Sequence, residues 1–391
     1  MTTAPAMHFA PTREQTVLRN RVRRFARQQL GADVARLDRE RLFDRDGWKA
    51  CADFGVLGWP IPAEYGGAGL DPLTTIMAFE ALGQGCADNG LVFAINNHLF
   101  ACAVYLLDHG TPEQCKRWLP ALCDGSLIGA HALTEEETGS DMLSLRTTAV
   151  RDGGRYVLNG TKMFISNAPV ADLFIVFART SETAAPQQAL SAFIVPADTP
   201  GLTVREIPKA GLRGTPMGEV SFTDCAVPAD LLLGSEGGGY AAFTRTMEWE
   251  RGFMVASQVG VLARLVDRCV RHASTRQQFG RPIGDFQAVS HTIADMRVRL
   301  ELSQLLLYKV GWLRSQGRLA LNEVSMLKLY VSESLKASAL ETMQLHGARG
   351  YTEDLGVERE VRDVLAGTIY GGTSQIQRSI ISGLLGLSGP A

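Results

Sequence analysis

The chain lacks the features that mark several common classes of protein. Its seven cysteines form no CxxC pair and no metal-like cluster with histidine, so we expect reduced thiols, no metal centre and a cytoplasmic location. The formal net charge of −2 and the isoelectric point of about 6.4 leave no basic surface for nucleic acid. Met1 to Met7 has neither a basic start nor an apolar run, so we expect no signal peptide.

Long hydrophobic runs are also scarce. The most apolar stretch, residues 91–107, is interrupted by Asn96, Asn97 and His98, and we expect it to be too short and too polar to span a bilayer. A pair of buried helices is the better interpretation. The hydrophobic fraction of 46% is that of an ordinary soluble globular protein, and we expect no membrane partner.

What is present falls into three segments. A chain of 391 residues is too long for one small core. Helical spacing of apolar residues fills the first segment and returns in the last, whereas the middle segment alternates like strands. The strand-like runs are 173–178, 190–195 and 218–222, with turns at Gly153-Gly154 and Asn159-Gly160, and the long helical segments are 240–275, 287–316 and 320–346. This order predicts an α+β, mostly helical protein with domains at 1–125, 126–235 and 236–391.

Four segments of the sequence occur in an order that is more specific than any one of them alone. They are His131-Ala132-Leu133-Thr134-Glu135 with Gly139-Ser140-Asp141, Lys162-Met163-Phe164-Ile165-Ser166-Asn167, Arg276-Gln277-Gln278-Phe279-Gly280 with Phe286-Gln287, and Ile369-Tyr370-Gly371-Gly372-Thr373-Ser374-Gln375-Ile376-Gln377-Arg378. A lone Gly-Ser-Asp is usually a surface turn, and a lone arginine is usually a solvated helix end. In this order, the four segments resemble those of the acyl-CoA dehydrogenases, whose C-terminal signature reads I-Y-E-G-T-x-x-I-Q.

The resemblance implies a fold and a cofactor. The fold has an N-terminal helical domain, a middle β-barrel-like domain and a C-terminal four-helix bundle. The cofactor is FAD, whose flavin needs hydrogen-bond partners along one edge and an apolar wall beside the ring. The positions that match cofactor-binding residues are Leu133, Thr134, Gly139, Ser140, Phe164, Ser166, Arg276, Gln278, Phe279, Gln287, Gln344, Gly347, Thr373 and Gln375. Arg276, Gln278 and Phe279, with Gln344 and Gly347-Ala348, resemble residues that reach FAD in a neighbouring subunit, which implies a homotetramer or a homodimer.

The signature departs from the family at its most reactive position. Gly371 stands where the family often has the glutamate that removes the substrate α-proton. A glycine keeps the backbone N–H, which in the family helps to bind the thioester oxygen. Branches such as isovaleryl-CoA dehydrogenase carry the base on an earlier helix, and Glu250, directly before Arg251, falls at that place. Most helical glutamates are solvated or salt-bridged, so only this position and the missing signature glutamate together favour Glu250. Glu248 points to a different helix face and is interpreted as structural.

The implied reaction is α,β-dehydrogenation of an acyl thioester. The candidate pocket residues are Phe93, Asn97, Ser140, Phe243, Met247, Arg251 and Tyr370. A narrower resemblance, to the prolyl-carrier-protein dehydrogenases of natural-product pathways, rests on Met247-Glu248-Trp249-Glu250-Arg251-Gly252, on Asn167-Ala168-Pro169 with Ala171-Asp172, and on the signature without glutamate. It implies an acyl or aminoacyl group on a carrier protein.

Three alternatives stay open at this stage. The first is an acyl-CoA dehydrogenase of branched-chain or fatty-acid catabolism, also with Glu250 as base. The second is a flavin-dependent oxygenase or N-hydroxylase on the same fold, and the third is a non-catalytic flavoprotein. The sequence does not name the acyl group, and it leaves the electron acceptor open between an electron-transfer flavoprotein and oxygen.

Overall fold

The computed structural model describes residues 10–387, so the segment Met1 to Met7 lies outside the described residues. The chain divides into two compact units. Unit 1 comprises residues 1–35, 71–92 and 251–391, and unit 2 comprises residues 36–70 and 93–250. The domain boundaries expected near residues 125 and 235 stay a prediction.

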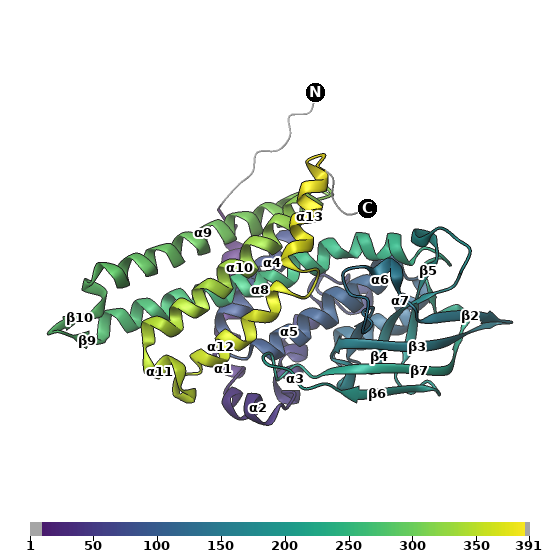
Figure 1. Ribbon diagram of the computed structural model, residues 1–391, viewed down its shortest axis with the longest axis horizontal. Coiled ribbons are helices and arrows are strands. Elements are labelled where there is room, and N and C mark those ends of the chain that lie inside the picture. Colours follow the sequence, from purple (N-terminus) through teal and green to yellow (C-terminus); the bar gives the residue numbers. More distant parts are fainter. Residues whose placement is uncertain (1–9, 388–391) are drawn as a thin grey trace. The chain divides into compact units, whose positions relative to one another are not determined.

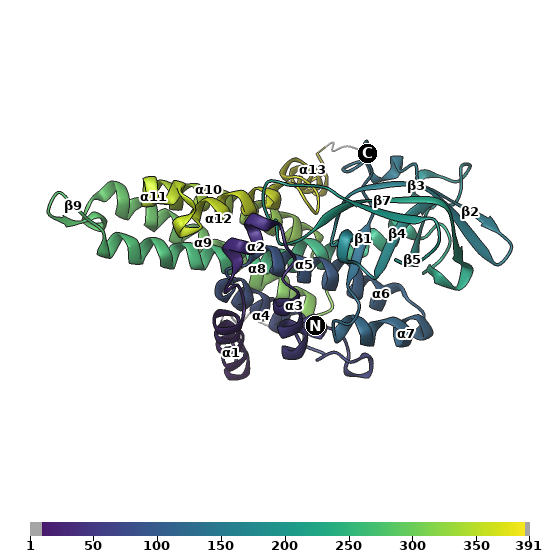
Figure 2. The same ribbon diagram turned by 90° about the horizontal axis from the view of Figure 1, so that it is seen from below.

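Most elements of both units are labelled in Figure 1 or Figure 2. Within residues 10–387 the α-helices are α1 (Arg13–Gln29), α2 (Val34–Glu40), α3 (Arg45–Phe54), α4 (Pro72–Gly85), α5 (Asn89–His98), α6 (Val104–His109), α7 (Pro112–Cys123), α8 (Gly239–Thr275), α9 (Gln287–Ser315), α10 (Leu321–His346), α11 (Ala348–Tyr351), α12 (Val357–Val364) and α13 (Ser374–Leu384). The strands are β1 (Gly129–Ala132), β2 (Thr148–Asp152), β3 (Arg155–Ser166), β4 (Leu173–Arg179), β5 (Leu190–Pro196), β6 (Leu202–Glu206), β7 (Met217–Pro228), β8 (Leu232–Leu233), β9 (Gln277–Gln278) and β10 (Arg281–Pro282).

Unit 1 is a helical bundle. Helices α8, α9 and α10 match the three long helical segments predicted from the spacing to within one residue at each end. Helices α9 and α10 pack side by side, joined by a short loop (Figure 1). Helices α4 and α8 approach closely at Gly83, because a Cβ there would lie 2.0 Å from the Ser257 carbonyl oxygen.

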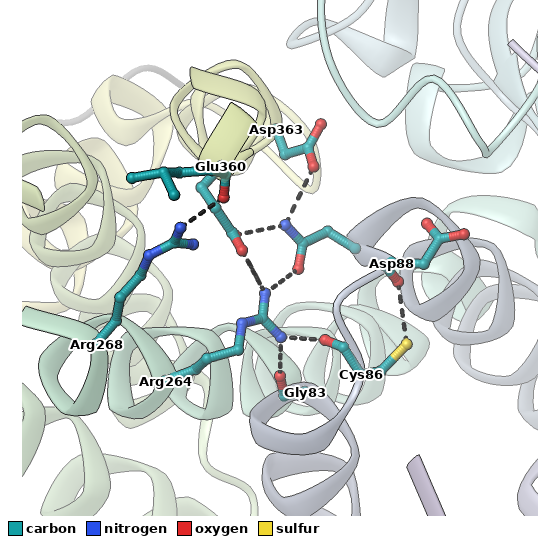
Figure 3. Close-up of polar contacts among 9 residues, drawn as sticks. Gly83, Cys86, Asp88, Arg264, Arg268, Glu360 and Asp363 are labelled. Atoms are coloured by element: carbon teal, nitrogen blue, oxygen red, sulfur yellow. Dashed lines mark hydrogen bonds and ion pairs between the residues drawn. The ribbon is translucent and has the colours of Figure 1, made fainter. Parts of the chain in front are cut away.

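A buried polar network ties three helices of unit 1 together (Figure 3). Arg264 on α8 donates to the carbonyl oxygens of Gly83 and Cys86 at the end of α4, and to the carboxylate of Glu360 on α12. Arg268, one turn further along α8, donates to the Leu355 carbonyl oxygen, 2.5 Å away. Carbonyls at the end of a helix have no hydrogen-bond partner within it. Arg264 therefore supplies donors to the last carbonyls of α4 and at the same time binds α12.

Unit 2 is built around one sheet with the strand order β6-β7-β3-β2-β4-β5-β8, and β1 pairs in parallel with β4. The predicted strand-like runs lie in β4, β5 and β7, and Gly153-Gly154 forms the predicted turn between β2 and β3. The expectation of a second turn at Asn159-Gly160 was wrong, because β3 runs straight through it. The pairing with β7 shifts register between Leu158 and Gly160, and Gly160 has a φ of 144°. The glycine therefore marks an irregularity within a long strand.

The most apolar stretch of the sequence is one helical run and not the expected helix pair. Helix α5, a π-helical turn (Leu99–Ala103) and α6 follow one another from Asn89 to His109. By length and composition alone, with a mean hydropathy of 1.6, this run is long and apolar enough to cross a membrane, so the expectation that it is too short and too polar was wrong. Its most apolar window is 89% buried inside the protein, which a core helix of a soluble protein also shows.

Candidate active site

In unit 2, the first two sequence motifs come together beside the end of β3. The Met163 N–H donates to the Thr134 carbonyl oxygen, 2.8 Å away, and the Lys162 ammonium donates to the Leu133 carbonyl oxygen, 3.0 Å away. Gly139 lies in the following loop, where a Cβ would be 3.8 Å from the Thr134 side chain. This arrangement gathers the predicted cofactor residues Leu133, Thr134, Gly139, Phe164 and Ser166, while Ser140 stays exposed in the loop.

Phe164 stands out within this group because its backbone is strained. Its φ is 61°, a value that bulky side chains rarely adopt. The strain falls where the pairing of β3 with β7 shifts register between Lys162 and Ile165. The residue is left 50% exposed near the end of the strand. A displayed aromatic ring held by a strained backbone is a feature of ligand sites, and here it offers a planar apolar wall.

A buried ion pair fixes the loop that carries Leu133 and Thr134. Lys162, fully buried, lies 2.8 Å from a carboxylate oxygen of Glu135. Glu135 also accepts hydrogen bonds from the Thr147 N–H and hydroxyl and from the Arg146 N–H. Burial raises the pKa of Glu135, but Lys162 and these hydrogen bonds outweigh it and hold the pKa below its ordinary value. Burial lowers the pKa of Lys162 to about 8, with Glu135 opposing the shift. Sequence reasoning gave neither residue this role.

Helix α5 supports the end of β3. The Asn97 side-chain amide donates to the Ser166 carbonyl oxygen at 3.3 Å, and the Asn167 side-chain amide donates to the Ala94 carbonyl oxygen at 3.0 Å. Phe93 lies half-buried one turn before Asn97, on the same face of the helix. Asn97, predicted as a pocket residue, therefore also holds Ser166.

The N-terminal part of α8, up to Glu250, places three predicted residues on one helix face. Phe243, Met247 and Glu250 are spaced four and three residues apart, the spacing at which helical side chains are neighbours. The Phe243 ring lies nearly parallel to His131, with centroids 6.4 Å apart, and Met247 is buried. Glu250 is half-buried, and its Oε2 atom is shielded from solvent. The carboxylate therefore shares a face with two apolar side chains.

In unit 1, the signature forms a tight turn whose carbonyls are held by side chains from three helices. Gly371 and Gly372 have φ values of 61° and 89°. Arg251 Nε donates to the Gly371 carbonyl oxygen at 2.7 Å, and Lys328 Nζ donates to the Gly372 carbonyl oxygen at 2.6 Å. Gln377 Nε2 donates to both carbonyl oxygens at 3.1 Å. Arg251, predicted as a pocket residue, thus binds the signature backbone.

Residues on either side of this turn have structural partners. The Tyr370 hydroxyl accepts a hydrogen bond from Gln258 on α8. Thr373 caps α13, since its hydroxyl accepts from the Ile376 N–H at 3.2 Å, and Gln375 is exposed. Sequence reasoning missed Lys328 and Gln377 as the residues that hold the turn. Lys328 had a detectable signal, because it occupies a position where the apolar spacing of α10 demands a core residue.

The remaining predicted cofactor residues lie at the other end of α8. Arg276, Gln278 and Phe279 belong to a segment that forms the β9–β10 hairpin, where Phe279 is 93% exposed. Gln287 begins α9, and Gln344 and Gly347 lie at the end of α10. Arg276 follows Arg251 by 25 residues along α8, about 37 Å at 1.5 Å per residue. The structure therefore does not bring these residues to the signature turn of the same chain.

Within residues 10–387, no group of three or more His, Cys, Asp or Glu side chains is placed to hold a metal ion. The seven cysteines all lie in that range, where they are free and buried.

The class of enzyme follows from comparison with known protein families. Three family models, described as the N-terminal, middle and C-terminal domains of acyl-CoA dehydrogenase, match residues 12–126, 130–225 and 237–385. The chain therefore belongs to the acyl-CoA dehydrogenase family of FAD-dependent oxidoreductases, which confirms the predicted family, fold and enzyme class.

Within this family, the chain is similar to enzymes of carrier-protein pathways. It is 42% identical over 347 residues to an L-prolyl-[peptidyl-carrier protein] dehydrogenase of Pseudomonas fluorescens, covering 88% of this chain and 91% of that one. The solved structure of the prolyl acyl carrier protein oxidase AnaB is 46% identical, with a TM-score of 0.94, covering 97% and 100% of the two chains. PigA, solved with FAD and proline, is 38% identical with a TM-score of 0.95, covering 98% and 100%.

Proposed function

We propose that this enzyme dehydrogenates the Cα–Cβ bond of an acyl or aminoacyl group tethered as a thioester to a carrier protein. The relatives named above, at 38–46% identity, support the carrier-protein substrate. The observation that carries the chemistry is the shared helix face of Phe243, Met247 and Glu250, which sets one carboxylate beside apolar side chains. Such surroundings suit a base that removes the proton bound to the α-carbon of the acyl or aminoacyl group.

Each residue of the site has a separate task in this proposal. Glu250 removes the α-proton, in place of the glutamate that Gly371 lacks. The Gly371 N–H donates to the thioester oxygen, where negative charge develops as the α-proton leaves. Phe243 and Met247 exclude water from the carboxylate and contact the acyl group, together with Phe93 and Tyr370.

The residues beside the end of β3 fit a flavin. Phe164 would cover one face of the ring, while backbone groups of Leu133 and Thr134 and the hydroxyl of Ser166 would bond its polar edge. The strained, half-exposed Phe164 supports this fit, because nothing in a regular strand requires such a conformation. Bound FAD supplies the acceptor for the hydride that leaves the β-carbon.

A second copy of the chain completes the cofactor site. Arg276, Gln278 and Phe279 are exposed, and they lie too far along α8 from the signature turn to serve one cofactor together with it. We therefore propose a homotetramer or homodimer in which this hairpin, with Gln287, Gln344 and Gly347, contacts FAD of a neighbour. The enzyme would work in the cytoplasm and pass electrons to an electron-transfer flavoprotein or to oxygen.

The proposal is tested by anaerobic flavin bleaching. The wild-type holoenzyme should bleach when mixed with an aminoacyl group, such as prolyl, on a peptidyl carrier protein. Glu250→Gln should keep the bound flavin but bleach about 10²- to 10⁴-fold more slowly, because general-base catalysis contributes a factor of that size. The matched control is Glu248→Gln, which removes a carboxylate two residues away on another helix face and should bleach within a fewfold of wild type.

Each contrary result has a distinct meaning. Wild-type bleaching rates in Glu250→Gln would refute the assignment of the base. Bleaching by free acyl-CoA but not by the carrier-bound group would favour the catabolic alternative. Consumption of oxygen and reduced flavin without an unsaturated product would favour the oxygenase alternative.

A further inference from the structure

Lys328 is a buried lysine in the middle of the helical bundle of unit 1. It lies on α10 between Val324, Leu327 and Val331, all fully buried, and its own exposed fraction is 1%. The spacing of these residues is that of a helix face packed against the core. A methionine or leucine would fill this position without burying a charge.

The ammonium group of Lys328 points at the signature turn. Its Nζ atom donates to the Gly372 carbonyl oxygen at 2.6 Å and lies 6.0 Å from the centre of the Tyr370 ring. Gly371 stands between these two residues. The lysine therefore contacts both sides of the residue whose N–H is the proposed donor to the substrate.

The Gly372 carbonyl does not by itself require a lysine. The Gly372 carbonyl oxygen already accepts a hydrogen bond from Gln377, 3.1 Å away, and the Gly371 carbonyl oxygen accepts from Arg251 and Gln377. Burying an ammonium group costs several kcal/mol after relaxation, far more than burying a neutral donor. Lys328 adds a second positive charge to this turn, beside that of Arg251.

We propose that Lys328 is a positioning residue for the reaction. Through the Gly372 carbonyl it holds the turn in the conformation that presents the Gly371 N–H, and its charge favours negative charge on an oxygen bound there. The proposal rests on the proposed function, since it assigns Lys328 to the same dehydrogenation. It predicts that removing Lys328 weakens binding of the negatively charged enolate form and hardly changes binding of the neutral form.

The test measures how well the holoenzyme stabilises a substrate enolate at equilibrium. The probe is a 3-thiaacyl pantetheine thioester, whose acidic α-carbon lets it bind as the enolate and give a long-wavelength absorption band with oxidised flavin. Lys328→Met should lower the enolate fraction at a given pH about tenfold, which raises the apparent pKa of the bound probe by about one unit. The Kd of a pantetheine thioether without the carbonyl should stay within twofold of wild type.

Two further variants separate charge, hydrogen bonding and folding. Lys328→Gln keeps a donor for the Gly372 carbonyl but loses the charge, and it should lower the enolate fraction by a similar factor. Lys336→Met is the matched control, because Lys336 lies on the same helix and pairs with Glu333 at 2.6 Å. That control should retain the wild-type band.

Each outcome decides between the two proposals. A wild-type band in folded Lys328→Met overturns the role of Lys328 and leaves the proposed function standing. A wild-type band in folded Lys328→Gln alone overturns the charge of Lys328 as the cause. A wild-type enzyme that gives no band and is bleached by no thioester overturns the proposed function itself. If neither variant folds with FAD bound while Lys336→Met does, Lys328 is required for folding, and the positioning role is withdrawn.

Discussion

At the residue scale, the glycines of the signature turn show what the family glutamate position has become. Gly371 and Gly372 both have positive φ values, which a glycine adopts at little cost. The sequence showed that the glutamate was missing, but it did not show that two successive residues adopt this conformation. The conformation of the turn therefore depends on the positive φ values of the two glycines and on the side-chain donors that bind their carbonyl oxygens.

Gly372→Ala tests this account of the turn. The φ of 89° is unfavourable for alanine, and its Cβ would lie 2.8 Å from Gln377 Nε2, one of the donors that hold the turn. We expect a loss of about 1–2 kcal/mol in the free energy of unfolding, measured by chemical denaturation of the holoenzyme. The control is Gly383→Ala, in α13, where a Cβ meets nothing within 4 Å and should be neutral or slightly stabilising. Equal stabilities of the two variants would refute the argument.

Residues in the sequence motifs were easier to propose as site candidates than buried lysines. The motif gave Leu133, Thr134 and Phe164, and the structure brings these together. Lys162 and Lys328 were passed over as site residues, because a lysine in a sequence is solvated unless its surroundings are known. The periodicity of α10 could have marked Lys328, and the alternation of β3 places Lys162 on the same face as the buried residues Tyr156 and Leu158.

At the element scale, long helices were predicted well and a strand irregularity was not. Helices α8, α9 and α10 repeat their apolar spacing over many turns. A few residues that depart from the pattern therefore change the predicted helix ends very little. An Asn-Gly pair between two strand-like runs usually marks a hairpin turn, yet Gly160 lies inside β3. A Cβ at Gly160 would lie 2.6 Å from the Thr147 hydroxyl, so the glycine serves a close approach of a neighbouring segment. That contact is not visible in the local sequence.

The network around Arg264 joins elements that the sequence does not link. Asn89 donates to Glu360 at 2.8 Å and to Asp363 at 3.1 Å, so α12 is held by both Arg264 and Asn89 (Figure 3). Burial raises the pKa of Glu360, but Arg264 and Asn89 outweigh it, and the pKa lies below its ordinary value. The carboxylate is therefore ionised and depends on its partners.

Arg264→Met should be strongly destabilising for this reason. Removing one member of a buried ion pair leaves an uncompensated charge, which costs about 3–5 kcal/mol, and here the carbonyls at the end of α4 lose their donor as well. We expect a large fall in the thermal unfolding midpoint of the holoenzyme. Arg297→Met removes an exposed arginine paired with Glu301 within α9 and should cost less than about 1 kcal/mol. Similar midpoints for the two variants would show that the buried network adds little stability.

At the scale of the whole molecule, acid should weaken the fold in two stages. Burial lowers the pKa of His98 and of His131 from 6.5 to about 4. Unfolded histidines take up protons below pH 6.5 while these two stay neutral, so stability is complete above pH 6.5 and falls as the pH drops towards 4. Glu135 and Glu360 have pKa values below their ordinary 4.5 and stabilise the fold above it, so their contribution is lost at lower pH. The histidines should therefore determine the first stage.

His98 offers the sharpest test of this order. Its Nδ1 accepts the Gly129 N–H at 2.9 Å and its Nε2–H donates to the Leu122 carbonyl oxygen at 3.0 Å, so the folded protein requires the neutral ring. The depressed pKa corresponds to about 3 kcal/mol lost between pH 6.5 and 4. His98→Gln can make similar hydrogen bonds but does not titrate. We expect it to be less stable than wild type at pH 7.5, with a difference in unfolding midpoint that shrinks by pH 5. His291→Gln changes an exposed histidine on α9. Its unfolding midpoint should differ from that of the wild type by the same amount at both pH values. If the difference in unfolding midpoint between His98→Gln and the wild type does not change with pH, His98 is not the cause of the loss of stability in acid.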